Sequence, residues 1–319
     1  MPAVTIVVPC YNHADFIGRR LESVFRQSFT DYEVIILDDA STDSSREVIV
    51  GYLSRPGVCF LENCSNSGSP SIQWNRGAAQ GSGRYIWIAE SDDFADPDFL
   101  SVLVPILDDN PRVGLAYSQS RAVDAAGNII GDPRHWFDDL ARGRWLADYY
   151  SSGQAECAHY LLWKNTVPNA SAALFRRSVF RAAGGSPEKM RLCGDWMTWV
   201  RMLLISDISF TARPLNFFRQ HTATVRATTG QRQFSFERWA VRSLISRKCP
   251  LPRSVRRELA RSTFGELLWL ARQDRGATRI GTLFRGLRSS WPILIRSPFG
   301  IFARGTTEPA AADPGRPSG

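Results

Sequence analysis

The first 120 residues alternate between short apolar runs and segments with helical spacing, and this alternation constrains the fold more than any other feature of the chain. Five continuous apolar runs, rich in β-branched residues, occupy positions 4–9, 33–37, 59–61, 85–89 and 113–117. Continuous rather than alternating apolar residues are typical of strands buried on both faces of a sheet. Repeated strand–helix units predict a mostly parallel α/β sheet with right-handed crossovers and helices on its flanks.

Helices are expected between these strands. Ile17, Leu21 and Val24 recur at helical spacing after the first run. A second helix is expected to open at the polar residues 41–43, because serine, threonine and aspartate favour helix N-termini. A third is expected to open at Pro97, because proline is favoured in the first turn of a helix.

Short polar residues follow four of the predicted strands. They are Tyr11 and Asn12 after the first strand, Asp38 and Asp39 after the second, Asn66 after the third, and Glu90, Asp92 and Asp93 after the fourth. The carboxyl ends of parallel strands form one rim, where open α/β sheets bind ligands. A ligand site is therefore predicted on this rim, although residues such as Asn12 also begin loops and cap helices.

The sequence after the first predicted strand does not match the common phosphate-binding motifs. The chain reads PCYNHAD after the first strand, with neither GxGxxG nor GxxxxGK[ST], which disfavours dinucleotide oxidoreductases and P-loop NTPases. Carboxylates repel phosphate, so a diphosphate ligand would need a divalent cation held by aspartate oxygens. Of the pair Asp92 and Asp93, one carboxylate would bind the metal and the other a ribose hydroxyl.

The chain has 319 residues, and its 39 basic and 31 acidic residues give a net charge of +8. Residues 1–221 hold 21 Lys and Arg against 25 Asp and Glu, whereas residues 222–319 hold 18 against 6. The basic charge thus lies far in sequence from the rim and gives no support to nucleic-acid binding. The length fits about two domains, or one large α/β domain with an appendage.

Residues 222–304 are expected to form a basic helical extension. Apolar residues at helical spacing form one stripe around Leu267 and another from Ile280 to Trp291, with arginines interspersed. Basic amphipathic helices with aromatic residues can lie on anionic bilayers, so residues 254–304 are a candidate membrane contact; packing on the rest of the chain is the alternative. Residues 305–319 are expected to be a disordered tail.

Targeting signals are absent from the sequence as it stands. No stretch reaches the ~18 consecutive apolar residues that a membrane span requires, and the N-terminus lacks the basic leader of a signal peptide. The expected location is the cytoplasm, either free or peripherally on the inner face of the membrane.

Longer motifs occur in a fixed order along the chain. They read PCYNHADFIGRRLESVFRQSFTDYEVIILDDASTDSS, NSGSPSIQWNRGAAQGSGRYIWIAESDDFADPDFL, NASAALFRRSVFRAAGG and GDWMTWVRMLLISDISFTARPLNFFRQH. Together, over roughly residues 3–225, they resemble family 2 glycosyltransferases of the GT-A fold. The resemblance implies a Rossmann-like, mostly parallel sheet with residues 1–120 as the nucleotide-sugar-binding half and 121–221 as the acceptor and catalytic half.

The resemblance also implies roles for residues at matching positions. The residues expected to hold a nucleotide-diphosphate sugar, by the resemblance or by their place on the rim, are Pro9, Tyr11, Asn12, Asp38, Asp39, Asn66 and Asp92, the last directed at the ribose. Asp93 is expected to bind Mg²⁺ or Mn²⁺, and His221 to lie near that metal or to be structural. Asp195 matches the catalytic base, although the pattern alone favours a helix N-cap in front of a core stripe. Trp196 is a candidate for stacking on an acceptor sugar.

Two positions depart from the pattern of the family. Glu90 stands where many members carry aspartate, and Gly194 stands where many carry an acidic residue before the base. Both departures make the donor preference of better-known relatives a poor guide to this chain.

The predicted function is metal-dependent, inverting transfer of a sugar to a hydroxyl of a saccharide or lipid-linked acceptor, in cell-envelope polysaccharide or glycolipid synthesis. Processive synthases of the family usually carry QxxRW, but here Ser235 stands three positions before Arg238. Transfer of one or a few sugars is therefore expected. A sugar-nucleotide pyrophosphorylase and a non-catalytic nucleotide-sugar-binding protein are the alternatives. The first would carry a glycine-rich basic loop after the first strand, and the second would not need Asp92, Asp93 and Asp195.

Overall fold

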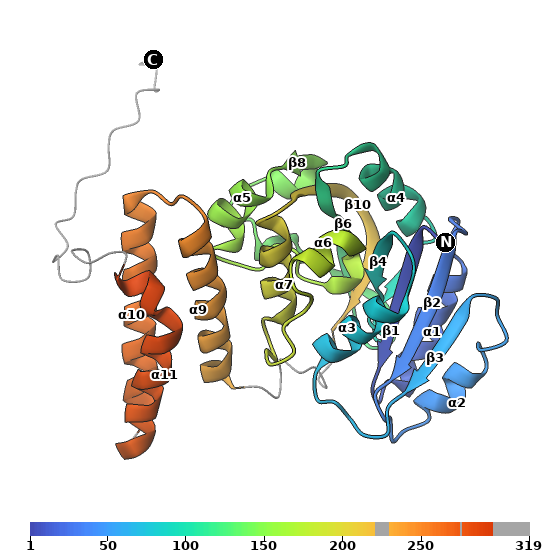
Figure 1. Ribbon diagram of the computed structural model, residues 1–319, viewed down its shortest axis with the longest axis horizontal. Coiled ribbons are helices and arrows are strands. Elements are labelled where there is room, and N and C mark those ends of the chain that lie inside the picture. The colour runs from blue at the N-terminus through green and yellow to red at the C-terminus, as the bar shows by residue number, and fades with distance from the viewer. Residues whose placement is uncertain (221–229, 275, 296–319) are drawn as a thin grey trace, which may run out of the picture. The chain divides into compact units, whose positions relative to one another are not determined.

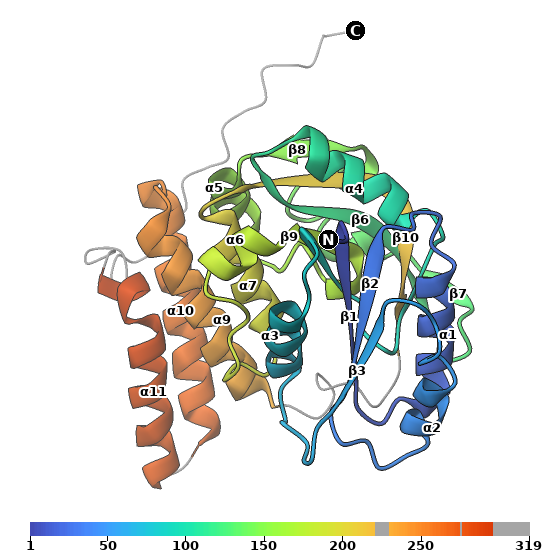
Figure 2. The same cartoon turned by 45° about the vertical axis from the view of Figure 1, so that its right-hand side comes forward.

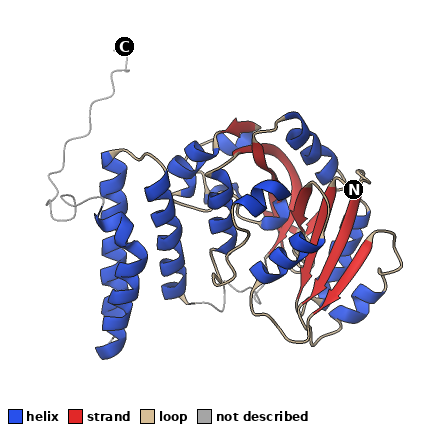
Figure 3. Cartoon of the chain, in the orientation of Figure 1, coloured by secondary structure: helices blue, strands red, loops and turns tan. Residues whose placement is uncertain are grey.

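The computed structural model describes residues 1–220, 230–274 and 276–295, and the chain divides into two compact units, Met1–Pro250 and Leu251–Gly319. The first unit holds a central sheet with helices on both faces (Figures 1 and 3). The second holds two long helices, α10 (Arg253–Gln273) and α11 (Gly276–Ile295), so the expected C-terminal helical extension is present. The predicted tail at 305–319 lies outside the described residues.

The described residues form a ten-stranded sheet in the order β3-β2-β1-β4-β9-β6-β10-β5, with β7 paired to β6 and β8 to β10. The strands are β1 (Val4–Cys10), β2 (Tyr32–Asp38), β3 (Val58–Glu62), β4 (Tyr85–Ile88), β5 (Phe94–Ala95), β6 (Val113–Val123), β7 (Ile129–Gly131), β8 (Tyr149–Ser151), β9 (Ala173–Arg176) and β10 (Asp207–Arg219). Strands occur at all five predicted positions.

Strand directions follow the prediction in the first half of the chain and depart from it afterwards. Strands β1, β2, β3 and β4 pair in parallel, as expected. Strand β9 then enters antiparallel between β4 and β6, while β6 and β10 run parallel to each other. The sequence pattern does not reveal β9, because a four-residue apolar run carries no period that separates a strand from a helix.

Helices cover both faces of this sheet. In the first unit they are α1 (Ala14–Phe25), α2 (Ser45–Val50), α3 (Pro70–Gln80), α4 (Phe99–Asp109), α5 (Gly153–Glu156), α6 (Arg177–Ala182), α7 (Gly194–Leu203) and α9 (Gln231–Lys248). Ile6 and Val8 of β1 face the core cluster that contains Leu21 of α1, whereas Val7 faces α3. A Cβ on Gly77 of α3 would lie 2.3 Å from Val7 Cγ1, so only glycine permits this approach. Figure 2 shows α1 and α3 on opposite sides of β1 and β2.

Two helices begin later than expected. The helix predicted to open at residues 41–43 begins at Ser45, because the Ser41 hydroxyl donates to Asp38 Oδ1 at 2.5 Å and shapes the rim instead of capping α2. The helix predicted from Pro97 begins at Phe99, because the Pro97 carbonyl accepts a hydrogen bond from the Ser28 N–H. In both places, residues that local propensity predicts to be helical form part of a polar loop before the helix.

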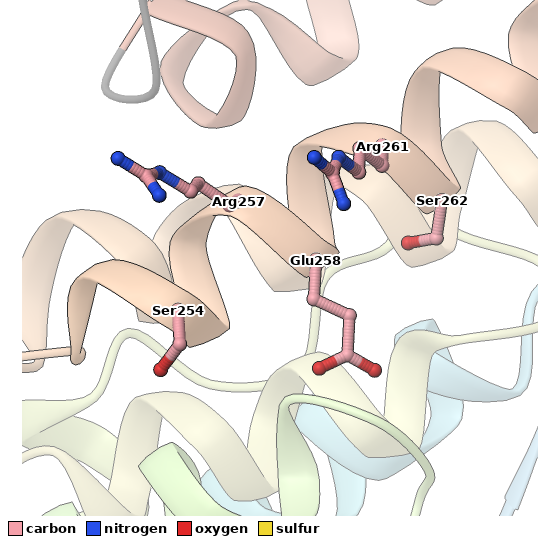
Figure 4. A pocket seen from close by; sticks show the side chains of 5 residues that line it. All are labelled: Ser254, Arg257, Glu258, Arg261 and Ser262. Carbon is pink, nitrogen blue, oxygen red and sulfur yellow. The ribbon is translucent and has the colours of Figure 1, made fainter. Parts of the chain in front are cut away.

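The second unit is an α-helical pair in which α10 and α11 pack on each other. Figure 4 shows a hollow on α10, where Arg257 and Arg261 point to one side and Glu258 to the other, together with Ser254 and Ser262. All five lining side chains come from one helix, so we assign this hollow no ligand. Neither these helices nor the others described combine the length and apolar character that crossing a bilayer requires.

Candidate active site

Polar groups at the ends of β1 and β2 meet on the rim. The Asn12 N–H donates to Ser41 Oγ at 3.0 Å, and the Thr42 N–H donates to Asn12 Oδ1 at 2.7 Å. Asn12 and Ala40 have φ angles of 53° and 60°, in the left-handed region, where asparagine is tolerated better than most residues. The loops after β1 and β2 are therefore bound to each other, which confirms that these strand ends converge.

The Asp39 carboxylate is buried and accepts five hydrogen bonds from the loop after β3 and from α3. Its Oδ1 accepts from the Asn63 amide, from the Ser67 N–H at 2.9 Å and from the Gln73 amide at 2.8 Å. Its Oδ2 accepts from the Ser67 hydroxyl at 2.7 Å and from the Asn66 amide at 3.3 Å. All five donors are neutral, so Asp39 fixes the loop after β3 through hydrogen bonds.

The other residues expected to hold a nucleotide lie nearby with different exposure. Pro9 and Asp38 are buried in β1 and β2. Tyr11, directly after β1, is 43% exposed. Tyr11 is therefore the predicted rim residue with the largest apolar surface open to a ligand.

The acidic pair follows β4. His13 Nδ1 and Ser91 Oγ lie 2.7 Å apart, which ties this segment to the loop after β1. Asp93 is buried; its Oδ1 accepts from the Arg219 N–H at 2.9 Å and its Oδ2 from the Asn169 amide at 2.8 Å. Burial, reinforced by repulsion from Asp92, raises the pKa of Asp93 to about 6.

Glu90 and Arg20 lie beside this pair, and Arg20 has no signal in the sequence analysis. Burial raises the pKa of Glu90 to about 8, and its Oε1 accepts from the Trp74 indole N–H at 2.7 Å. Arg20 of α1 is fully buried and donates through Nε to the Glu90 carbonyl at 2.8 Å. Burial lowers the pKa of Arg20 to about 10, while Asp93 and Asp92 act in the opposite direction. A buried cation therefore lies behind the carboxylates. The helical pattern of α1 gives no sign of this, because arginine is an ordinary residue at a polar position of a helix.

Arg219, at the end of β10, is a second residue that sequence reasoning misses. Besides its N–H bond to Asp93, its Nε donates to the Asp92 carbonyl at 2.7 Å. Its Nη1 donates to the carbonyls of Asp124 at 2.9 Å and Ala125 at 2.5 Å, in the turn after β6. Arg219 thus fixes the backbone of the acidic pair against a strand more than a hundred residues away.

The acidic residues fit a hard divalent cation by their chemistry. The pKa values of Glu90 and Asp93 are raised by burial and by repulsion from Asp92, so an added positive charge would relieve that repulsion. Asp92 and Asp93 supply carboxylate oxygens, the ligands that Mg²⁺ and Mn²⁺ prefer. Among the described residues, no group of three His, Cys, Asp or Glu side chains could hold a metal ion by itself. His221, the other predicted ligand, lies outside the described residues.

Asp195 lies in the first turn of α7, where the helix dipole favours a negative charge. Its Oδ2 accepts from the Asn165 amide at 2.9 Å, and its Oδ1 accepts from the Trp196 N–H at 2.7 Å. The preceding residue, Gly194, packs against α3: a Cβ there would lie 3.0 Å from Ser71 Oγ. The first turn of α7 is therefore held against the start of α3, the helix that follows the Asp39 loop.

Trp196 is not available to an acceptor sugar. It is only 3% exposed, and its indole N–H donates to the Leu161 carbonyl at 3.0 Å. The expectation that it stacks on a sugar is therefore wrong for this structure: at its helical position the ring faces the core, as the ring of Trp199 does.

The segment expected to form the acceptor side holds a buried ion pair among aromatic rings, which we name the Arg144 cluster. Glu156 is fully buried and accepts from Arg144 Nη2 at 2.7 Å. The Arg144 guanidinium lies 3.8 Å from the ring centre of Tyr149 and 4.2 Å from that of Tyr160. The Tyr149 hydroxyl lies 2.7 Å from the Tyr117 hydroxyl of β6. The cluster ties the irregular segment to the sheet.

Comparisons with solved structures identify the fold. Staphylococcus aureus TarS 1–349 in complex with UDP-GlcNAc superposes with a TM-score of 0.68 at 14% identity, over 91% of this chain and 81% of that one. A Pyrobaculum calidifontis mannosyltransferase in complex with GDP-Man and Mn²⁺ gives a TM-score of 0.52 at 17% identity, over 90% of this chain and 74% of that one. At these identities the likeness shows the GT-A fold and nothing finer.

Comparisons of sequence identify the family. Escherichia coli chondroitin synthase is 33% identical over 43% of this chain but only 20% of its own length, so this chain corresponds to a small part of that synthase. An uncharacterized Mycobacterium tuberculosis protein is 25% identical over 98% of this chain and 95% of its own length. The model of the family "Glycosyl transferase family 2" matches residues 5–184, more than half of the sequence. The chain therefore belongs to glycosyl transferase family 2.

Proposed function

We propose that this protein transfers a sugar from a nucleotide-diphosphate sugar to a hydroxyl of a saccharide or lipid-linked acceptor, with inversion and without processive polymerisation. The observation that carries the proposal is the convergence of Asn12, Asp39 and the Asp92–Asp93 pair on one rim. These groups present negative charge and fixed hydrogen-bonding atoms where an open α/β sheet binds ligands. Polysaccharide synthesis is proposed because chondroitin synthase and the poly(ribitol-phosphate) transferases are among the relatives.

On the donor side, Tyr11 would cover the base, and Asp92 would accept a hydrogen bond from the ribose. Asp39 would meet a base N–H only by giving up one of its five present donors, of which the Asn66 amide, at 3.3 Å, is the most distant. We therefore assign Asp39 to positioning the loop that surrounds the base. Neutralisation of the leaving diphosphate is the chemistry that Mg²⁺ or Mn²⁺, held by Asp93, would supply when bound.

On the acceptor side, Asp195 would take the proton of the attacking hydroxyl. The acceptor oxygen forms a bond to the anomeric carbon as the bond from that carbon to the diphosphate breaks, and the nucleoside diphosphate leaves with the electron pair. Attack opposite the leaving group inverts the anomeric centre. Asn165 holds one Asp195 oxygen at 2.9 Å, which fixes the direction of the carboxylate.

The alternatives explain the rim less well. A pyrophosphorylase needs backbone and basic groups that cradle a triphosphate after β1, whereas this chain places the exposed Tyr11 there. A protein that only binds nucleotide-sugars gives no reason for an aspartate oriented by Asn165 at the start of α7.

The test combines binding and turnover. UDP-, GDP- and dTDP-sugars are screened by thermal shift with and without Mn²⁺; one base class is expected to raise the unfolding midpoint only with metal. The Asp195→Asn variant should keep that shift but lose transfer by at least about a hundredfold, because a general base contributes that much or more. Asp108→Asn, at an exposed ion pair with Arg84, is the control and should retain turnover. Full turnover by Asp195→Asn would remove Asp195 as the base, and no shift with any donor would overturn the proposal.

A further inference from the structure

Helix α11 exposes a row of four large apolar side chains. Ile280, Phe284, Leu287 and Trp291 are 59%, 74%, 36% and 56% exposed. Their spacing of four, three and four residues places them on one face of the helix, which we name the α11 stripe. A helix of a soluble domain normally buries such a face and exposes its polar one.

The buried face of α11 carries three small residues together with Ile293. Thr282, Gly286 and Ser290 recur every four residues and are buried. Their polar atoms are satisfied locally: the Thr282 hydroxyl donates to Asp274 Oδ2 at 2.6 Å, and the Ser290 hydroxyl donates to the Gly286 carbonyl at 2.7 Å. Small side chains permit close packing between helices, and burying them leaves the aromatic residues of α11 on the outer side.

Charge accompanies this exposed apolar face. Arg279, Arg285 and Arg288 lie on α11, and the sequence has no Asp or Glu between Asp274 and Glu308. At 100° per residue, Arg288 lies beside the α11 stripe, about 70° from its centre, whereas Arg279 and Arg285 lie about 110° and about 130° from it. A stripe of Ile, Phe, Leu and Trp, on a helix that carries arginines and no acidic residue, suits the surface of an anionic bilayer, where hydrocarbon lies beneath phosphate groups.

We propose that the α11 stripe docks on the surface of an anionic lipid bilayer, with Phe284 and Trp291 inserted among the acyl chains, Arg288 at the phosphates beside them, and the other arginines of α11 adding long-range attraction. A second copy of this chain fits less well, because self-pairing would bring arginines together with no acidic residue of α11 between them. The inference deepens the proposed function, since a bilayer surface is where lipid-linked acceptors reside. The docking itself requires neither donor nor acceptor.

The test is flotation of the full chain with vesicles. Vesicles of phosphatidylcholine with about a third phosphatidylglycerol should bind the protein, vesicles of phosphatidylcholine alone should not, and about 0.5 M salt should release part of it. Phe284→Ser with Trp291→Ser should reduce binding at least about tenfold, because both anchors are lost. Arg285→Gln with Arg288→Gln should weaken binding to anionic vesicles through lost charge alone.

A matched control separates the stripe from general stickiness. Ile129→Ser with Ile130→Ser removes a pair of exposed apolar residues from β7, outside α11, and should leave vesicle binding unchanged. Transfer to a water-soluble acceptor should survive Phe284→Ser with Trp291→Ser, so a failure of docking is distinguishable from a failure of the proposed catalysis. Equal vesicle binding by the stripe variant and the natural chain would overturn the proposal. A concentration-dependent dimer that the stripe variant abolishes, without vesicle binding, would also overturn it in favour of a second copy.

Discussion

The rim and the Arg144 cluster both bury carboxylates, but they compensate them differently. On the rim, Asp39 is held by neutral amides, a hydroxyl and a backbone N–H, and Asp93 by an amide and a backbone N–H. In the Arg144 cluster, Glu156 is paired with a guanidinium that aromatic rings cover. The hydrogen-bond donors to both rim carboxylates are neutral, and Arg20 acts on Asp93 only through its charge, whereas Glu156 is hydrogen-bonded to the Arg144 guanidinium. We therefore expect the rim carboxylates to respond to an added cation and the Arg144 cluster to contribute mainly to stability.

The largest effect on stability is expected from Arg144→Met. Removing one partner of a buried ion pair leaves Glu156 buried and uncompensated, which costs about 3–5 kcal/mol of the free energy of unfolding. Chemical denaturation measures this loss. Arg84→Met, which breaks an exposed ion pair with Asp108, is the control and should cost at most about 1 kcal/mol.

The same variant should respond to pH in a defined direction. Burial raises the pKa of Glu156 above its unfolded value, and Arg144 acts against that rise. Without Arg144 the folded pKa climbs further, so the folded state binds more protons than the unfolded state across a wider window. Stability then falls as pH rises above about 4.3, and the loss in Arg144→Met should be greater at pH 8 than at pH 5. Adding Glu156→Gln should recover part of the loss; no recovery would mean that lost packing, not buried charge, explains the effect.

A smaller loss is expected when Asp39 on the rim is changed to Asn. An amide offers one oxygen where the carboxylate offered two, so one group of neutral donors, for example Ser67 and Asn66, loses its acceptor. The cost is about 1–3 kcal/mol, the penalty for leaving buried polar groups unpaired. Donor binding, measured by thermal shift, should fall with it, because the loop from Asn63 to Ser67 is no longer fixed. A variant of normal stability that has lost all donor binding would show instead that Asp39 contacts the donor directly.

The same two regions explain how far the sequence could be read. The rim was predictable because β1, β2 and β4 are continuous apolar runs, and the residue after a strand in a parallel sheet has only one edge to occupy. The rule predicts that Asn12, Asp39 and the acidic pair lie on one edge, and hydrogen bonds between the loops that carry them, from Asn12 to Ser41 and between His13 and Ser91, agree with it. The individual roles of the carboxylates (ribose, metal and base) were predicted from the resemblance to the family, because the spacing of the residues does not distinguish these roles.

The rest of the site depends on contacts that no local pattern encodes. Arg20 stands in a helix where arginine is ordinary, and only burial against Glu90 distinguishes it. Arg219 reaches the Asp92 carbonyl across 127 positions of sequence. Trp196 lies in an apolar helical stripe, and that period fits a core position at least as well as a sugar platform; its burial decides for the core. Tertiary packing therefore overrides local chemistry at the positions where the prediction failed.

The smallest effect on stability, and the sharpest test of the rim, is expected from Tyr11→Ala. Tyr11 is 43% exposed, so truncating it should change the free energy of unfolding by no more than about 0.5 kcal/mol. Stacking of an aromatic ring on a base is worth about 1–3 kcal/mol, so donor affinity should fall about tenfold, as calorimetric titration would show. Tyr150→Ala on β8 is the matched control, because Tyr150 is similarly exposed but lies outside the rim. If both variants bind the donor as the natural chain does, the base lies elsewhere and the rim holds only the diphosphate. If Tyr11→Ala alone loses donor affinity at unchanged stability, then the exposed ring on the rim serves ligand binding. The rings of the Arg144 cluster, in contrast, serve the stability of the fold.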